Sequence, residues 1–600
     1  MTAIVRPLEH RIYSWLIANT TRPTNDTHFP GPQPTGAVEV DWLQGIDLPL
    51  QDVSLGTTTL LALVTCFQGT GRLLRSTNSL TEKWNATFHD VVVVNTFKTF
   101  LGLALLLVSV PLVLPITCIF WGCSCCVSLL YTLKFGSCVT KVEGMDNMWG
   151  VESQESRPFI TISIVLSGVP NLDKITRHIQ TMIMDKKDSK GEYKYKKFRQ
   201  VFSQTYGYNS WTNVEDFKIE NHVRVINLRK LYSSEADSGN TSHQAESHSA
   251  DAAPAGPTPA TNVDDDELVL RYLNEEGEAA LPPDRPPWEM ILLAREDNRY
   301  NAVVRLHHAI ADGVSLIRLW MEALVDTPLQ PPRVGPPPPS TIVRAALMVW
   351  SALVLPLGLL KVVANFDYNS LHGRPLSGRK VMAASRAMPL AMLKKVKLAA
   401  HATVNDVLMT CLAAALSKHF SRRSEDVPKV TAAIPVSLHG GRQPSALTNC
   451  YSVATVNLPA GRALTPTARL AATKKVLDGM KRDPTLEAVF WVVRVISQVL
   501  PARVAQLLVS GKGVTLAASN VPGPQQEVSV WGDTVEDLLF WVPNRAPVGV
   551  GVSFASYMGV VRVGVNVDDA LIHSRQEAQV LLQDMEDELH TLYHYLLLEE

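Results

Sequence analysis

A single uncharged stretch constrains this chain more than any other feature of its sequence. No charged residue stands between Lys98 and Lys134, and the chain from Phe100 to Phe135 is almost uninterruptedly apolar. A helix needs about 20 apolar residues to cross the hydrocarbon core of a bilayer, so this stretch is more than long enough. A buried helix of this length would be exceptional in a soluble protein. The sequence therefore predicts a membrane-embedded segment over residues 98–136.

Two prolines near the middle of this segment leave its shape open. Pro111 and Pro115 each lack a backbone donor, so a helix that passes through them is expected to bend. One interpretation is a tilted or kinked helix that crosses the bilayer once. The other is a hairpin that enters one leaflet and returns, with each arm too short to cross.

The cysteines of the chain indicate its surroundings rather than its chemistry. Eight cysteines among 600 residues do not indicate a disulfide framework, so we expect a reducing, cytosol-facing catalytic region. Five lie in or just after the apolar segment: Cys118, Cys123, Cys125, Cys126 and Cys138. No histidine or carboxylate interleaves with the first four, which argues against a metal site. Two alternatives stay open, apolar filling and S-palmitoylation near a membrane surface.

The bulk properties exclude some classes of protein. The chain is too long for one hydrophobic core, so we expect two or more domains. Its formal net charge of -1 gives no electrostatic case for binding nucleic acid. Residues 1–97 carry no pattern of a cleaved signal peptide and form an N-terminal region of unknown structure.

Two adjacent histidines carry the clearest chemical signal. The apolar, β-type segment from Asn301 to Leu306 runs into His307 and His308, and Gly313 opens a helix with apolar residues at helical spacing. Adjacent imidazoles pack poorly at the end of a buried strand, because each ring needs hydrogen-bond partners. They suit general-base catalysis, in which a neutral imidazole removes a proton from an alcohol or amine that attacks an activated acyl carbon. The alternative is a structural histidine pair in a strand–turn.

The same residues resemble a known family. His307-His308-x-x-x-Asp312-Gly313 is similar to the HHxxxDG signature of the CoA-dependent acyltransferase superfamily. Three further segments resemble motifs of its wax ester synthase/diacylglycerol acyltransferase family: Leu281 to Glu289, Asn405 to Leu408, and Ser519 to Pro524. The resemblance covers about residues 140–595. It departs from the family at Pro287, where a leucine is usual, and in the N-terminal region to about residue 138, which has no counterpart in soluble or peripheral members.

This resemblance implies a fold, a reaction and a set of site residues. The fold would be the two-lobed, chloramphenicol-acetyltransferase-like α/β arrangement, preceded here by the N-terminal membrane segment. The reaction would be transfer of a long-chain acyl group from acyl-CoA, the co-substrate, to a fatty alcohol or to diacylglycerol, with no metal or other cofactor. The implied catalytic residues are His308 as general base, His307 in support, and Asp312 and Gly313 holding the loop. The implied substrate-binding or oxyanion residues are Asn405, Ser519 and Asn520. Trp288 is expected to pack beneath the site.

Composition and resemblance together divide the chain. The expected parts are the region 1–97, the membrane segment 98–136, an N-terminal lobe 137–326 with a disordered insertion 233–267, a proline-rich crossover 327–340, an apolar and possibly membrane-contacting segment 341–366, and a C-terminal lobe 367–600. A basic run from Lys186 to Arg199, which includes Lys197, is expected to be a solvated loop or to contact anionic headgroups or the phosphates of CoA. The implied location is the endoplasmic reticulum or the lipid-droplet surface.

Three other interpretations compete with this one. A catalytically inactive, membrane-bound lipid-binding or scaffold protein could retain the same fold. His307 and Asp312 also satisfy the His-x4-Asp pattern of glycerol-phosphate acyltransferases, but the later Phe-Pro-Glu-Gly block of those enzymes is absent. Condensation domains of peptide synthetases share HHxxxDG but have no reason for long membrane segments. No Gly-x-Ser-x-Gly elbow occurs, which argues against a covalent serine mechanism.

Overall fold

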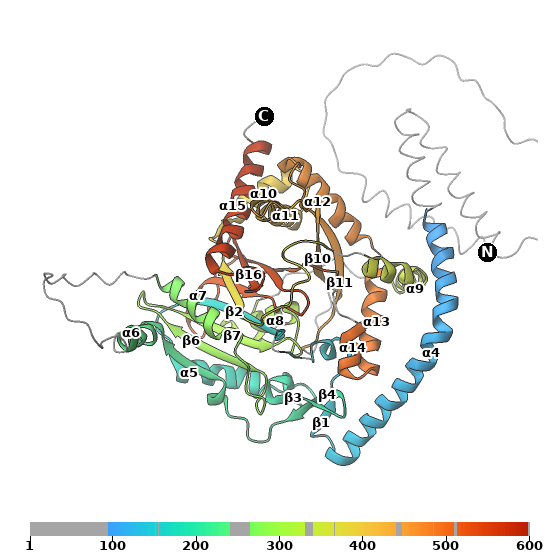
Figure 1. Ribbon diagram of the computed structural model, residues 1–600. Helices are drawn as coiled ribbons and strands as arrows, with labels where there is room; N and C mark the ends of the chain where they lie inside the picture. The colour runs from blue at the N-terminus through green and yellow to red at the C-terminus, as the bar shows by residue number, and fades with distance from the viewer. Residues whose placement is uncertain are drawn as a thin grey trace, which may run out of the picture. The chain divides into compact units, whose positions relative to one another are not determined.

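Two central sheets organise the chain, one for each lobe (Figure 1). The computed structural model describes residues 94–150, 152–153, 155–239, 264–329, 340–364, 367–439, 447–483, 485–508 and 513–597. Most of the predicted N-terminal region, most of the predicted insertion and most of the proline-rich crossover therefore lie outside the described residues.

The first lobe is built on a six-stranded sheet. Its strands lie in the order β13 (Ser529–Val530), β14 (Asp533–Trp541), β2 (Phe159–Ser167), β7 (Arg299–His307), β6 (Trp288–Ala294) and β5 (Val223–Asn227). All neighbours are antiparallel except β5 and β6. The strand β7 lies centrally and is buried along most of its length, including the polar side chains of Asn301 and Arg305. Strand β14 comes from the late part of the chain, so the sheet joins segments far apart in sequence.

Short elements surround this sheet. They are α5 (Leu172–Ile179), α6 (Leu228–Gly239), α7 (Asp265–Glu276), α8 (Gly313–Leu319), the single-turn elements η3 (Gly144–Trp149), η4 (Gln180–Met184), η5 (Lys196–Arg199), η6 (Ile219–Asn221) and η7 (Trp320–Leu324), and a small sheet of β1 (Val139–Lys141), β4 (Tyr208–Asn213) and β3 (Gln200–Thr205).

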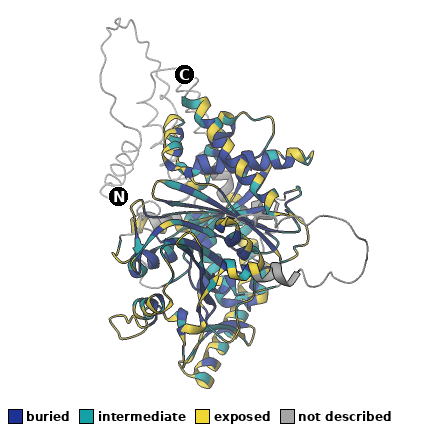
Figure 2. Cartoon of the chain, turned by 90° about the vertical axis from the view of Figure 1, so that its left-hand side faces the viewer, coloured by how far each residue is buried: buried dark blue, intermediate teal, exposed yellow. Residues whose placement is uncertain are grey.

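The second lobe is a mixed sheet covered by helices. Its strands lie in the order β11 (Tyr451–Pro459), β10 (Lys429–Ser437), β12 (Leu516–Pro522), β15 (Val550–Tyr557), β16 (Val560–Asp568) and β8 (Lys380–Ala384), with β9 (Met388–Pro389) also on β16. Strands β10, β12 and β15 run parallel. The covering helices are α10 (Leu390–Ala399), α11 (Val404–Arg422), α12 (Pro466–Lys481) and α15 (Arg575–Leu597). Buried residues follow the strands and nearly all of α11, which α10, α12 and α15 enclose (Figure 2).

The predicted membrane segment forms one continuous helix, α4 (Val94–Phe135), which passes through both Pro111 and Pro115. It therefore lacks the turn that the hairpin alternative requires. Within the described part of the chain, the segment Phe100–Phe135 is the one unbroken helix that is long and apolar enough to cross a membrane. The predicted second apolar segment also forms a helix, α9 (Thr341–Ala364).

Helix α4 lies against parts of both lobes. It contacts α9, α13 (Thr485–Val499) and β1, and Figure 1 shows it passing α9, α13 and α14 (Ala502–Leu508). Near its C-terminal end, the Tyr131 hydroxyl donates to the Thr205 carbonyl at 2.7 Å, and the Ser124 hydroxyl donates to the Gln498 carbonyl at 3.2 Å. Side chains on its other faces, such as Leu112 and Trp121, are exposed.

The predicted disordered insertion 233–267 was too long at both ends. Helix α6 continues to Gly239, and α7 begins at Asp265 behind an N-cap, where the Asp264 side chain accepts from the Asp266 amide. The two helices are stabilised by packing between Tyr232 on α6 and Leu268 and Tyr272 on α7. Composition alone did not reveal this, because the apolar residues that provide it lie at or beyond the ends of the polar stretch.

Candidate active site

The predicted histidine motif lies where β7 meets α8. Strand β7 ends at His307, which pairs in register with Phe159 of β2. The next residue leaves the sheet, and the His308 amide donates to the Pro158 carbonyl at 2.7 Å. Asp312 then caps α8, because its side chain accepts from the Ser315 amide at 2.8 Å. The strand end and the helix cap together hold the loop between them.

His308 faces a cavity and is neutral. Its ring stacks on Trp149, with ring centroids 4.0 Å apart. Burial lowers the pKa of His308 to about 4, so at neutral pH one ring nitrogen is unprotonated and can accept a proton. A neutral imidazole in the wall of a cavity can accept a proton from a bound hydroxyl group, as a general base does.

His307 points to the other side of the strand and is fully buried. Its Nδ1 accepts from the Ala309 amide at 3.0 Å, which shapes the loop after it. Its Nε2 lies 3.2 Å from a carboxylate oxygen of Glu152, and hydrogen bonding to His307 lowers the pKa of that carboxyl group. These contacts suit the supporting role that the resemblance implies.

The Asp312 side chain has a structural role, because its carboxylate accepts hydrogen bonds from groups that hold the loop. Besides the Ser315 amide, its carboxylate accepts from the Cys450 amide at 2.8 Å and from His439 Nε2 at 3.0 Å. Burial alone would raise the pKa of Asp312, but these hydrogen bonds, led by that from His439, hold the pKa below its usual value. At Gly313, an added Cβ would lie 3.2 Å from Val521, which is a tight contact. Both residues therefore hold the loop against the second lobe.

The cavity beside His308 has a volume of about 160 Å³ and is almost entirely apolar. Its walls come from β2, β6 and β7, from α8 and η7, and from β12 and β14. Trp288 lies in the wall and donates from Nε1 to the Phe198 carbonyl at 3.0 Å, so it packs beside the site as expected. Besides His308, the polar side chain of Ser519 reaches the wall.

The three predicted substrate-binding residues divide into two groups. Ser519 lines the cavity together with His308, whereas Asn405 and Asn520 do not. Successive residues of a strand point to opposite faces, so Asn520 lies on the other face of β12. There its Nδ2 donates to Asn405 Oδ1 at 3.2 Å. At the start of α11 it is Thr403 that forms the N-cap, with Asp406 completing a capping box, so capping does not account for Asn405.

Sequence reasoning missed a buried polar cluster around the His308 loop. Lys197 Nζ donates to Asp146 Oδ2 at 2.6 Å and to the carbonyls of Ile310 and Leu447 at 2.9 and 2.8 Å. Asn449 binds Asp146 and the His308 carbonyl. Neither prediction for the basic run holds for Lys197, because its ammonium group lies inside the protein. No local signal marks these residues, which come from three separate segments.

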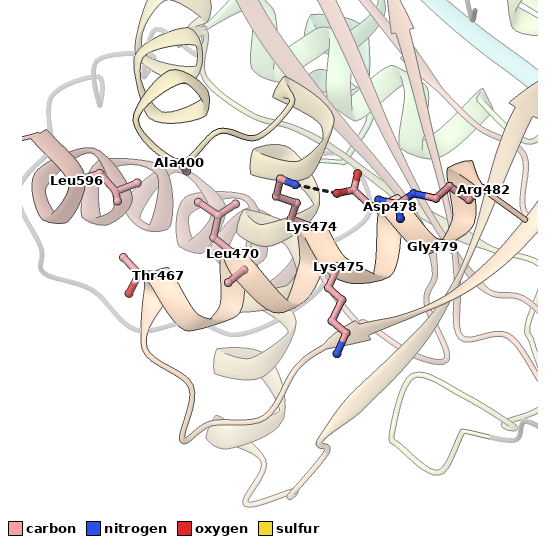
Figure 3. A pocket seen from close by; sticks show the side chains of 10 residues that line it. Ala400, Thr467, Leu470, Lys474, Lys475, Asp478, Gly479, Arg482 and Leu596 are labelled. Atoms are coloured by element: carbon pink, nitrogen blue, oxygen red, sulfur yellow. Dashed lines mark hydrogen bonds and ion pairs between the residues drawn. The ribbon is translucent and has the colours of Figure 1, made fainter. Parts of the chain in front are cut away.

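A larger hollow of about 600 Å³ lies elsewhere, on the outside of the second lobe (Figure 3). It is bordered by α12, the end of α10 and the end of α15, and Lys474 pairs there with Asp478 at 2.8 Å. The described residues that line it include no histidine or cysteine, and their one carboxylate, that of Asp478, is paired with Lys474. The candidate active site is therefore the smaller, apolar cavity that His308 lines.

Comparisons with known proteins agree with this geometry. The family model described as the wax ester synthase/diacylglycerol acyltransferase catalytic domain matches residues 257–368, and that of the WS/DGAT C-terminal domain matches residues 447–593. Wax ester synthase/diacylglycerol acyltransferase 5 of Arabidopsis thaliana is 25% identical over 388 residues, which is 55% of this chain and 76% of that protein. The corresponding protein 6 is 22% identical over 395 residues, with the same coverage of 55% and 76%.

A solved structure supports the fold. The wax ester synthase/diacylglycerol acyltransferase from Marinobacter aquaeolei VT8 superposes with a TM-score of 0.50 at 18% identity, covering 76% of this chain and 100% of that chain. The two-lobed α/β arrangement expected from the motifs is therefore confirmed.

Proposed function

Because the chain belongs to the wax ester synthase/diacylglycerol acyltransferase family, we propose that it is a membrane-bound O-acyltransferase that uses His308 as its general base. Its acyl donor is a long-chain acyl-CoA. Its acceptor is a lipid alcohol, either a fatty alcohol, which gives a wax ester, or diacylglycerol, which gives triacylglycerol.

The observation that carries the proposal is the neutral His308 ring in the wall of an apolar cavity. The acceptor hydroxyl would donate its proton to His308 as its oxygen attacks the thioester carbonyl. The tetrahedral intermediate would then collapse, and the CoA sulfur would leave with the proton that the imidazolium returns. No covalent enzyme intermediate is needed, because both substrates meet at one ring.

Ser519 is the residue best placed to help the developing oxyanion, because its side chain reaches the same cavity wall as His308. A hydroxyl donor aimed at that charge stabilises the transition state more than the ground state. Asn405 and Asn520 bind each other on the far face of β12, so we assign them to substrate binding outside this cavity rather than to the oxyanion.

The membrane part of the proposal rests on α4 and α9. Exposed apolar side chains cover α4 from Phe100 to Leu133, and Ile342 and Val349 are exposed on α9. Both proposed substrates partition into bilayers, so a lipid-facing helix against the catalytic lobes shortens their path to the site. The location proposed is the cytosolic face of the endoplasmic reticulum or of lipid droplets.

The test is CoA release by membranes that contain the full chain, with palmitoyl-CoA as donor and either hexadecanol or diacylglycerol as acceptor. Acceptor-dependent release by the wild type and its loss in His308→Ala are expected, and the lipid product identifies the acceptor. His590→Ala is the matched control, because His590 is exposed on α15. Full activity of His308→Ala would refute the role of His308. Absence of release with every alcohol offered would favour the inactive lipid-binding alternative.

A further inference from the structure

Helix α4 is too long for all of its apolar part to lie in the hydrocarbon core of the bilayer that it is proposed to cross. That part, Phe100–Phe135, has 36 residues, which at a rise of about 1.5 Å per residue make a helix about 54 Å long. The core is about 30 Å thick, and a tilt of roughly 40°, the upper end of the usual range, would still leave a height of about 41 Å. One end of this helix therefore extends out of the core.

The C-terminal end of α4 is the end that leaves the core. Lys141 Nζ donates to the Ser124 hydroxyl, so an ammonium group lies beside the helix at the level of Ser124. A charged group is costly inside the hydrocarbon core, which places this level in the headgroup region or beyond it. Trp121, about one turn earlier, is 62% exposed, and exposed tryptophan is typical of the point where a helix meets the headgroups. The stretch from Phe100 to Trp121, about 33 Å long, is then sufficient to span the core.

Three cysteines follow Trp121 at this boundary. Cys123, Cys125 and Cys126 are exposed and carry free thiols. Cysteine is among the most buried residue types, so three exposed cysteines within about one helical turn are unusual. Among the residues that the structure describes, no group of three or more histidine, cysteine or carboxylate side chains could hold a metal ion. Metal binding therefore does not account for these thiols.

The helix directs the three thiols away from the catalytic lobes. Ser124, which stands among them, is buried and donates to the Gln498 carbonyl at 3.2 Å, so it marks the side of α4 that faces the protein. Successive residues lie about 100° apart around a helix, so Cys123 and Cys125 flank Ser124. Cys126, two residues beyond Ser124, lies nearly opposite it. Acyl chains on these sulfurs would therefore enter the surrounding leaflet without disturbing the contacts of Ser124.

We propose that Cys123, Cys125 and Cys126 are S-acylation sites that carry long-chain acyl groups at the membrane surface. This inference rests on the proposed membrane placement of α4 and not on acyl transfer at His308. In the modification, a cysteine thiolate attacks the thioester carbonyl of a long-chain acyl-CoA, and the new carbon–sulfur bond forms as the bond to the CoA sulfur breaks. CoA leaves as the thiol, with the proton that the cysteine gave up. The added chains insert beside α4 and hold this level of the helix at the interface.

The test is metabolic labelling of the full chain in eukaryotic cells with an alkyne analogue of palmitate. The chain is purified from carbonate-washed membranes and coupled to a fluorophore, with and without treatment by neutral hydroxylamine, which cleaves thioesters but not oxyesters. The wild type should carry a hydroxylamine-sensitive label, and the triple variant Cys123→Ala, Cys125→Ala, Cys126→Ala should lose it. Cys118→Ala is the matched control, because Cys118 is also exposed on α4 but lies on the core side of Trp121, where the charged CoA does not enter. It should keep the label.

The label is read on the protein itself, so it is separate from catalytic turnover. His308→Ala should carry the same label as the wild type, and a chain that is labelled but releases no CoA would refute the proposed acyl transfer while supporting S-acylation. Wild-type protein in the carbonate-resistant pellet without label would overturn the inference and leave the proposed function intact. A triple variant that keeps the label, or loss of the label in Cys118→Ala, would also overturn it. Recovery of the wild type in the soluble fraction would refute the membrane placement of α4 and the inference with it.

Discussion

Lys197 provides the sharpest test of how the catalytic loop is held. Its ammonium group lies among four oxygens: Asp146 Oδ2 and the carbonyls of Ala309, Ile310 and Leu447. Two of these carbonyls follow His308 directly, and the third belongs to the second lobe. The side chains of Lys197 and Asp146 are each only 12% exposed, so water replaces this ion pair poorly.

The structure allows the cost of losing this lysine to be estimated. Lys197→Met would leave the Asp146 carboxylate charged and largely buried, although the two hydrogen bonds from Asn449 remain. Removing one partner of a buried pair costs about 3 to 5 kcal/mol, and we expect the lower end here because Asn449 still compensates Asp146. If the native conformation of the His308 loop is destabilised by about 3 kcal/mol relative to inactive conformations, the population of the active conformation and hence kcat fall roughly 100-fold.

The assay is CoA release per mole of membrane protein, together with thermal unfolding of the purified chain. Lys196→Met is the matched control, because the neighbouring Lys196 is exposed and should tolerate the change. Adding Asp146→Asn to Lys197→Met removes the unpaired charge, so the double variant should recover part of the lost stability. A Lys197→Met protein with the unfolding temperature and kcat of the wild type would refute the reasoning.

Two further predictions follow from the site and from α4. Because the pKa of His308 is about 4, more than nine-tenths of the rings stay neutral at pH 5.5, so kcat/KM should fall less than twofold between pH 7.5 and 5.5. With a histidine base of ordinary pKa, kcat/KM would fall about tenfold over the same range. A tenfold fall would therefore contradict the effect of burial on the ring. The double variant Val113→Lys, Ile116→Lys places two charges on an exposed apolar face of α4, and each charge costs roughly 2.5 to 3.5 kcal/mol in lipid. It should move the protein from the carbonate-resistant membrane pellet to the soluble fraction. The control variant Val113→Leu, Ile116→Leu should remain in the pellet.

Local features of the sequence predicted the secondary structure around His307 and His308. The apolar run before His307 predicted strand β7, and Asp312 and Gly313 mark the cap and start of α8. These features succeed because strand, loop and helix cap are decided by neighbouring residues. Ser519 also reached the cavity, as its motif implied, because the alternation along β12 places Ser519 and Val521 on one face.

The rest of the site depends on contacts that no local pattern reveals. Lys197 stands in a basic run, and composition alone treats such a run as exposed, whereas the fold places this one ammonium group next to Asp146. Asn449 has no neighbouring motif, and its importance arises from Asp146 and His308, 303 and 141 residues away in the chain. Asn405 and Asn520 were predicted from motifs, but only the three-dimensional structure shows that their side chains are hydrogen-bonded to each other.

These long-range contacts make the active site a joint product of both lobes. Strand β14, from the late part of the chain, completes the first-lobe sheet beside β2, while β12 of the second lobe supplies Ser519 and Val521 to the cavity wall. The segment that leads into β11 supplies Asn449 to the His308 loop and the Cys450 amide to Asp312. A first lobe without these segments would expose an unpaired sheet edge, deprive the His308 carbonyl of the Asn449 donor and leave the Asp312 carboxylate with the Ser315 amide alone. The histidine motif is therefore necessary for the base, but the geometry that makes His308 useful is provided by the other half of the chain.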